Sequence, residues 1–141
     1  MQFELDPVLA GDTFEVASFD LCEVRLMNDA RFPWLILVPR REAAVEILDL
    51  EPADQDQLWK EIRAAAESLR RTCRPDKLNI AALGNQVAQL HVHVVARFRS
   101  DEAWPAPVWG SGRPRRYSRQ DGDDILNALE STLTPAGQAS E

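Results

Sequence analysis

The segment from residue 89 to residue 95 reads Q-L-H-V-H-V-V and contains both histidines of the 141-residue chain. Its polar and apolar residues alternate, which is the pattern of a β-strand with one face toward a core. In such a strand Gln89, His91 and His93 share one face, and the apolar residues between them share the other. The pattern therefore predicts a strand over residues 90–98 that presents two imidazoles and a carboxamide to the same side.

Four other segments carry strand patterns, and one of them is apolar throughout. That segment reads W-L-I-L-V and is bounded by prolines, which predicts a short strand buried on both faces. The others alternate partly between apolar and polar residues. The predicted strands cover residues 13–19, 21–27, 34–38 and 77–83.

Two segments carry the three- and four-residue spacing of amphipathic helices. The longer begins at Glu51-Pro52, where proline is favoured because its missing N–H has no helical partner, and it ends before Pro75. The shorter covers residues 118–133. These elements indicate one α+β domain over residues 1–133, followed by a disordered tail over residues 134–141.

Composition excludes several classes of protein. The net charge of −7 argues against non-specific nucleic-acid binding, and we find neither a bilayer-spanning stretch nor a signal peptide, so we expect a cytoplasmic protein. Cys22 and Cys73 match no metal-ligand spacing and are expected as reduced thiols. Residues 97–116 hold five arginines against two acidic residues. This basic strip suits a small anionic ligand or is a solvated arginine-rich loop.

Spacing alone leaves three interpretations of the two histidines. They can be surface residues of a half-exposed strand, two ligands of a metal ion, or the nucleophile and acid–base groups of an active site. The loop at residues 84–86 reads G-N-Q and precedes the strand. Such a loop can bring N–H groups and amide side chains to an oxyanion, although an ordinary turn has the same composition.

With these residues in hand, the chain resembles the histidine triad superfamily of nucleotide hydrolases and transferases. The family signature has three histidines at alternate strand positions, and residues 89–95 match it with glutamine in the first position. Residues 84–87, G-N-Q-V, resemble the loop before that strand. Residues 26–40 resemble the ribose-contacting strand and the strand that follows it. Residues 103–105, A-W-P, resemble a C-terminal Trp-Pro segment.

The resemblance implies a fold, an activity and a set of site residues. The fold would be α+β, an antiparallel sheet of about five strands with one long helix packed on it and a short C-terminal helix. The middle histidine of the family, here His91, would attack the α-phosphate of a nucleotide and form a nucleotidyl-histidine intermediate. The other residues implied at the site are His93 and Gln89 as catalytic groups, and Asn28, Asn85, Gln86 and Trp104 as substrate-binding groups.

The resemblance also implies partners. The ligand would be a purine nucleotide or dinucleoside polyphosphate, and no cofactor is implied. The fold implies a homodimer whose strands join into a continuous sheet, with C-terminal segments near the partner's site. No membrane or nucleic-acid partner is expected.

Three residues depart from the family pattern: Gln89, Gln86 in place of a hydroxyl residue, and Trp34 in place of glycine. Glutamine exchanges hydrogen bonds but cannot shuttle a proton. Three hypotheses therefore stay open: an enzyme that cleaves phosphoanhydride or phosphoramidate bonds, a nucleotide-binding module with little turnover, and a metalloprotein in which His91 and His93 hold zinc or a similar ion.

Overall fold

The fold is an antiparallel five-stranded sheet with helices on both of its faces. The structure is a computed structural model that describes residues 2–134, so most of the tail expected over residues 134–141 lies outside the described residues. The strands pair in the order β1-β2-β3-β5-β4, and every pairing is antiparallel. The strands are β1 (Thr13–Ser18), β2 (Cys22–Met27), β3 (Trp34–Pro39), β4 (Lys77–Ala81) and β5 (Val92–Arg97).

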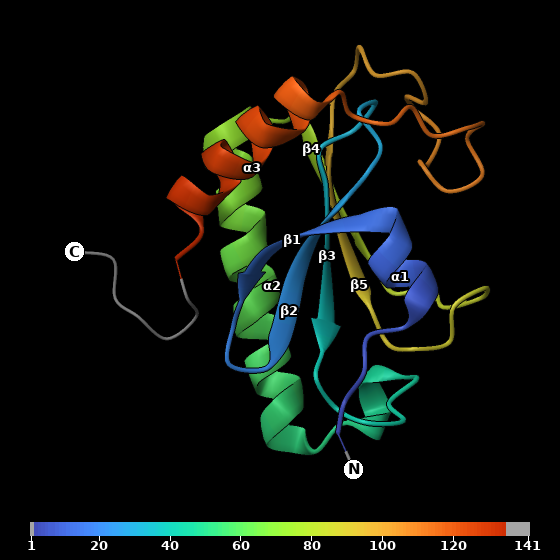
Figure 1. The fold of residues 1–141 in the computed structure, drawn as a ribbon, viewed down its shortest axis with the longest axis vertical. Helices are drawn as coiled ribbons and strands as arrows, with labels where there is room; N and C mark the ends of the chain where they lie inside the picture. The colour runs from blue at the N-terminus through green and yellow to red at the C-terminus, as the bar shows by residue number, and fades with distance from the viewer. Residues whose placement is uncertain (1, 135–141) are drawn as a thin grey trace.

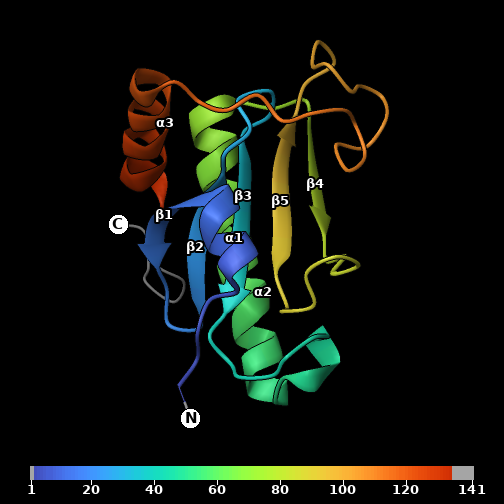
Figure 2. The same cartoon turned by 45° about the vertical axis from the view of Figure 1, so that its right-hand side comes forward.

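The helices divide between the two faces of the sheet. They are α1 (Pro7–Asp12), the 3-10 turn η1 (Ile47–Asp49), α2 (Pro52–Cys73) and α3 (Arg119–Thr132). Figure 1 shows α2 and α3 on one side of the sheet, and α1 on the other side with the loop that joins β5 to α3. Turning the molecule shows β5 and β4 at one end of the sheet, beside that loop (Figure 2). The α+β class and the five-stranded sheet expected from the sequence are confirmed. None of the described helices is both long and apolar enough to span a bilayer.

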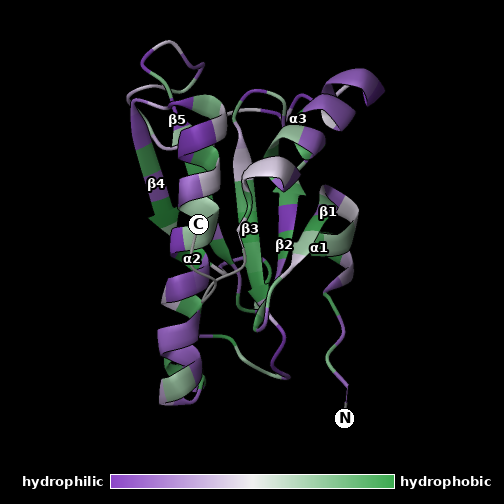
Figure 3. Ribbon diagram, turned by 90° about the vertical axis from the view of Figure 1, so that its left-hand side faces the viewer, coloured by the Kyte–Doolittle hydropathy of each residue, from purple (hydrophilic) through white to green (hydrophobic). Residues whose placement is uncertain are grey.

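Strand β3 is buried along its whole length, as its uninterrupted apolar sequence predicts. Alternate residues of the strand belong to two different hydrophobic clusters. Leu35 and Leu37 pack with α2 and α3, whereas Trp34 and Ile36 pack with Leu9 of α1 and with the loop after β5. In Figure 3 the strand is hydrophobic over most of its length, while α2 alternates between hydrophilic and hydrophobic residues. One strand therefore supports both the core and the opposite face.

Helix α2 begins and ends where its sequence predicts. Pro52 stands at its start, and Arg74 adopts the left-handed conformation at φ 50° just after its end and before Pro75. Its apolar stripe includes Leu58, Ile62 and Leu69, all of which are buried. The helix consequently forms the rigid backing of the sheet.

A buried carboxylate joins α2 to the turn between β1 and β2. Glu61 has no exposed surface, and its two oxygens accept hydrogen bonds from the backbone N–H groups of Leu21 at 2.9 Å and Cys22 at 2.7 Å. The side chain of Gln57 donates a third at 2.7 Å. Burial, and the adjacent carboxylate of Glu61, raise the pKa of the Cys22 thiol far above its usual range. Cys22 is therefore a neutral thiol in the core. Both Cys22 and Cys73 are free thiols in the structure, as the sequence analysis expected.

Two short elements were not predicted. Helix α1 has a recognisable start, because the Asp6 side chain accepts from the Val8 N–H at 2.8 Å and Pro7 follows the cap. Its six residues are too few for a periodic apolar pattern. The 3-10 turn η1 has three residues, which are also too few to give a recognisable sequence pattern. Strand β5 begins at Val92 rather than at residue 90, so His91 precedes the strand.

We predict that Glu61→Ala lowers the free energy of unfolding by about 3–5 kcal/mol, because it removes a buried charged acceptor and leaves two buried N–H groups unpaired. Urea denaturation measures the change. The matched control is Glu130→Ala, the same substitution at an exposed site of helix α3, which should change stability by less than about 0.5 kcal/mol. Equal effects of the two substitutions would contradict the role given to Glu61.

Candidate active site

A cavity of about 530 Å³ lies on the α1 side of the sheet. Its volume is within the range of ligand sites, roughly 300–1,000 Å³. Segments far apart in the chain surround it: α1, the β2–β3 turn, the loop of residues 83–87, the two histidines, and residues 108–116 of the loop before α3. The cavity therefore brings together candidate residues from three separate regions of the sequence, namely Asn28, the pair Asn85 and Gln86, and the pair His91 and His93.

His91 is almost buried, with 7% of its surface exposed, and lines this cavity. Its Nδ1 lies 2.7 Å from the backbone carbonyl oxygen of Gln89. Because a carbonyl oxygen only accepts hydrogen bonds, Nδ1 carries a proton, and in the neutral ring Nε2 keeps its lone pair. The ring is thus held in the tautomer that a nucleophile requires.

His93 lies on β5 beside His91, with 5% of its surface exposed. The ring centroids of the two histidines are 4.8 Å apart. The Nδ1 of His93 lies 3.0 Å from the indole nitrogen of Trp34. Burial, with a smaller contribution from His91, lowers the pKa of His93 to about 3. His93 is therefore a neutral imidazole at physiological pH.

A second tryptophan closes the other side of the His93 ring. The ring centroid of Trp109 lies 5.3 Å from that of His93 and 6.1 Å from that of Trp34, both in edge-to-face arrangements. Its indole nitrogen is buried and makes no hydrogen bond with the residues that the structure describes. The two tryptophans restrict His93 to one orientation.

The polar loop expected to face phosphate does line the cavity. Gly84, Asn85 and Gln86 all contribute to its wall, and both amide side chains are exposed. Gly84 has φ +74°, a conformation that glycine adopts without strain. Asn28 also lines the cavity, and its side-chain oxygen accepts from the N–H of Tyr117 at 2.9 Å. Asn28 thus joins the cavity wall to the segment that leads into α3.

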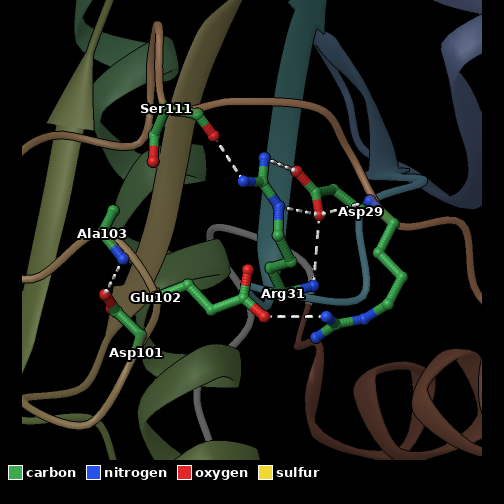
Figure 4. Close-up of polar contacts among 7 residues, drawn as sticks. Asp29, Arg31, Asp101, Glu102, Ala103 and Ser111 are labelled. Carbon is green, nitrogen blue, oxygen red and sulfur yellow. Dashed lines mark hydrogen bonds and ion pairs between the residues drawn. The ribbon is translucent and has the colours of Figure 1, made fainter.

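An ion pair anchors the loop that covers one side of the cavity (Figure 4). Asp29 and Arg31 pair at 2.8 Å, and both side chains are largely buried. Arg31 also donates to the backbone carbonyl of Ser111, and the N–H of Arg115 donates to Asp29 at 3.3 Å. Burial alone would raise the pKa of Asp29, but the hydrogen bonds from Arg31 and Arg115 outweigh it and lower the pKa. The sequence analysis assigned no role to this pair.

Two of the expected site residues point elsewhere. The carboxamide of Gln89 accepts from the N–H of Asp6 at 2.8 Å and donates to the carbonyl of Glu4 at 2.9 Å, and Gln89 is not among the cavity residues. The expectation of a shared face assumed an extended strand at residue 89, whereas β5 begins at Val92. The contribution of Gln89 to the histidine pair is its backbone carbonyl.

Trp104 also lies outside the cavity wall, and Trp109 of the same loop stands there instead. The ring of Trp104 packs near the guanidinium of Arg97, 5.7 Å from its centroid. Arg97 is buried and pairs with Asp101 at 2.8 Å. Trp104 therefore belongs to the packing of the loop, and a Trp-Pro sequence motif alone could not separate the two tryptophans.

No cluster of three or more His, Cys, Asp or Glu side chains within residues 2–134 is placed to hold a metal ion. The two imidazoles each commit one nitrogen to a protein partner, which leaves two free nitrogens and no third ligand beside them. Structural zinc sites use four protein ligands and catalytic sites three. The described residues thus give no support to the metalloprotein hypothesis.

Comparison with solved structures finds close relatives over nearly the whole chain. A histidine triad protein from Bradyrhizobium japonicum is 42% identical, with a TM-score of 0.93 over 95% of this chain and 100% of that one. A histidine triad (HIT) protein from Sinorhizobium meliloti 1021 is also 42% identical, with a TM-score of 0.91 over 93% of this chain and 97% of that one.

A more distant structure shares the fold alone. It is a hypothetical histidine triad nucleotide-binding protein from Sulfolobus tokodaii, 14% identical, with a TM-score of 0.66 over 86% of this chain and 83% of that one. No curated protein sequence matches the chain. The HIT domain family model matches residues 10–100, which contain the sheet, α2 and both histidines. The chain belongs to the HIT domain family.

Proposed function

We propose that the protein is a nucleotide hydrolase or nucleotidyl transferase that cleaves a phosphoanhydride or phosphoramidate bond at the α-phosphate. The observation that carries this proposal is the state of His91, whose Nδ1–H is held by the Gln89 carbonyl while its Nε2 is free in a cavity. Membership of the HIT family supports the same chemistry. The ligand we propose is a purine nucleotide or dinucleoside polyphosphate.

The reaction takes place in two displacements at phosphorus. The lone pair on Nε2 of His91 forms a bond to the α-phosphorus, and the bond to the leaving group breaks with its electron pair on that group. Water, or an acceptor hydroxyl in a transfer reaction, then attacks the nucleotidyl-histidine. The P–N bond breaks, its electron pair returns to Nε2, and the proton of the attacking group passes to solvent.

Several groups around the cavity can stabilise the charge on phosphate oxygens. Nε2–H of His93 and the amide groups of Asn85 and Gln86 are donors at the cavity wall. Arg116 stands at the cavity rim with an exposed side chain, which suits the negative charge of an entering nucleotide. The cavity thus combines one nucleophile with neutral donors and a peripheral cation.

One observation favours a second candidate function, a nucleotide-binding module with slow turnover. Gln89 occupies the first triad position, and its side chain faces the N-terminal segment instead of the cavity. The remaining imidazole, His93, has its pKa lowered to about 3 by burial and His91. Such a site keeps its ligand-binding donors but lacks a strong acid for leaving-group departure.

We propose, as for the family fold, a homodimer in which β4 pairs with the same strand of a second copy. β4 is an edge strand, and Ile80 on it is 43% exposed. A hollow beside it is lined by Leu78 and Ile80 of β4 and by α2, including Trp59, which is 56% exposed. An unpaired edge next to an apolar hollow is a ready site for strand addition.

We predict that His91→Ala lowers turnover of diadenosine polyphosphates or adenosine phosphoramidate by about 10³-fold or more, because the nucleophile is lost. Mass spectrometry of quenched wild-type reactions should show a nucleotidyl adduct that is absent from the variant. Calorimetry with adenosine monophosphate serves as the control, since binding should survive the change. Unchanged turnover in His91→Ala would refute the enzyme assignment, and binding without adduct or turnover in the wild type would favour the binding module.

We predict that Asn85→Ala lowers kcat/KM by about 10²-fold, because one donor to the developing charge is removed. The matched control is Asn127→Ala, which makes the same change at an exposed position of α3. Steady-state kinetics on both variants measure the difference. If the two variants have equal rates, Asn85 does not contact the reacting phosphate.

We predict that Ile80→Lys converts the dimer to a monomer, because a lysine on the edge strand places a charge in the apolar contact. Size-exclusion chromatography with light scattering reports the mass. Val45→Lys is the matched control, since Val45 is 45% exposed but lies outside this face, and it should remain dimeric. A monomeric wild-type protein at micromolar concentration would contradict the proposed interface.

A further inference from the structure

Trp34 makes the only hydrogen bond that the described residues offer to the His93 ring, at 3.0 Å from its Nδ1. An indole nitrogen is a donor and never an acceptor, so Nδ1 of His93 must present a lone pair to it. The proton of the neutral ring is then on Nε2, on the cavity side. Both side chains are buried, Trp34 at 7% and His93 at 5% exposure, so water does not substitute for this contact.

We propose that Trp34 is a positioning residue that fixes His93 as a neutral Nε2–H donor, and that the site therefore favours substrates whose leaving group departs as an anion. The first part of this proposal stands on the hydrogen bond alone. The second part rests on the proposed function, because it concerns the group displaced from the α-phosphate. It predicts that phosphoanhydride bonds are cleaved in preference to phosphoramidate bonds, the two bond types that the proposed function includes.

The contacts around His93 oppose a second proton. Protonation at Nδ1 would direct an N–H at the N–H of Trp34, in a buried position where neither donor finds another acceptor. His91 lies 4.8 Å away, ring to ring, and Trp109 packs against the remaining edge. The pKa of His93 is lowered mainly by burial and, to a smaller extent, by the neighbouring His91.

The charged groups elsewhere on the cavity wall do not offset this. Asp29 is a buried carboxylate of the cavity wall and could in principle stabilise a charged imidazole, but it pairs with Arg31 at 2.8 Å. Asp12 and Arg116 line the wall with exposed side chains and carry opposite charges. No described carboxylate forms a hydrogen bond with His93, so no acidic group in the cavity stabilises a positive charge on its ring.

The consequence concerns how the leaving group departs. When the bond to a phosphate leaving group breaks, the electron pair remains on an oxygen that is stable as an anion, and neutral donors suffice. When a P–N bond breaks, the electron pair goes to nitrogen, which must gain a proton to leave as an amine. A neutral His93 can hydrogen-bond but is a poor acid, and the Gln89 side chain faces away from the cavity.

The tautomer is measurable because the chain holds only two histidines. Nitrogen-15 NMR of the untagged protein, labelled at histidine, should show a proton on Nε2 of His93 and a proton on Nδ1 of His91, two opposite tautomers. His93 should stay neutral from pH 8 to pH 5. A His93 ring that carries its proton on Nδ1, or that becomes charged near the ordinary pKa of about 6.5, would overturn the proposal.

Trp34→Phe tests whether the indole N–H is the cause, because it keeps an aromatic ring and removes the donor. We expect the pKa of His93 to rise, so that its resonances titrate at higher pH than in the wild type. Trp59→Phe is the matched control on α2, outside the cavity; it keeps an apolar ring in the proposed dimer contact and should leave the His93 resonances unchanged. Identical His93 titration in Trp34→Phe and wild type would overturn the role of Trp34. If Trp34→Phe does not fold, nitrogen-15 NMR of the wild type still tests the contact, because a scalar coupling across the hydrogen bond from the Trp34 N–H to Nδ1 of His93 is expected, and its absence would overturn the role of Trp34.

The substrate preference is tested with two compounds that share an adenylyl group. Attack at an α-phosphate of diadenosine tetraphosphate releases adenosine triphosphate as an anion, and attack on adenosine 5′-phosphoramidate must release ammonia. We expect the wild type to favour the anhydride by about 10²-fold or more in kcat/KM, the scale of general-acid catalysis. In Trp34→Phe the preference should fall by about 10-fold, and phosphoramidate turnover relative to wild type should increase as pH falls through the new pKa of His93.

The outcomes separate the proposals. Equal turnover of both compounds by the wild type would refute the substrate preference and leave the proposed function standing. A wild type that turns over neither compound and forms no adduct would refute the proposed function, and with it the preference. The tautomer of His93 is decided by the spectra in either case.

Discussion

Two imidazole rings are buried side by side in one cavity, and the electrostatic cost of that arrangement constrains the rest of the site. A charged imidazole in a buried position loses its hydration, and a second imidazole 4.8 Å away adds nothing that stabilises it. Burial, with a smaller contribution from His91, keeps His93 neutral, and each ring has a defined partner for one nitrogen. Nδ1 of His91 donates to a carbonyl oxygen, whereas Nδ1 of His93 accepts from an indole N–H. In the neutral rings, Nε2 of His91 therefore presents a lone pair and Nε2 of His93 presents an N–H.

The sheet makes this pairing possible because its central strand is buried on both faces. Trp34 and His93 lie on the cavity side of neighbouring strands, β3 and β5, whose register pairs Trp34 with Val95 and Ile36 with His93. On the opposite side, α2 and its buried carboxylate Glu61 hold the β1–β2 turn in place. The positions of the two rings thus depend on a helix and a turn that contribute no residue to the cavity wall.

The sequence predicted the elements with strong periodicity and the residues that belong to the family motif. Five residues that the resemblance placed at the site line the cavity, and their roles stay predictions: Asn28, Asn85, Gln86, His91 and His93. The predictions for Gln89 and Trp104 placed their side chains at the site, whereas their partners lie elsewhere. Alternation describes a strand, and it gives no information about a residue that precedes the strand or lies in a loop.

The contact of Trp34 with His93 could not be predicted either, for a different reason. The sequence showed that Trp34 replaces a glycine of the family pattern. However, Trp34 and His93 are 59 positions apart in the chain, and the pairing of β3 with β5 brings them together. Only the register decides which nitrogen of which ring the indole reaches. The Asp29–Arg31 pair was missed in the same way, because its importance comes from a loop that returns from residues 111–115.

The glutamine at position 89 illustrates how one residue links two parts of the site without entering it. Its backbone carbonyl holds the Nδ1–H of His91, while its carboxamide binds the chain at Glu4 and Asp6, directly before α1. Helix α1 in turn supplies Leu9 to the cavity wall. A histidine at this position has no carboxamide with which to donate and accept at the same two backbone groups. Gln89 therefore forms a fixed connection between His91 and the N-terminal wall of the cavity.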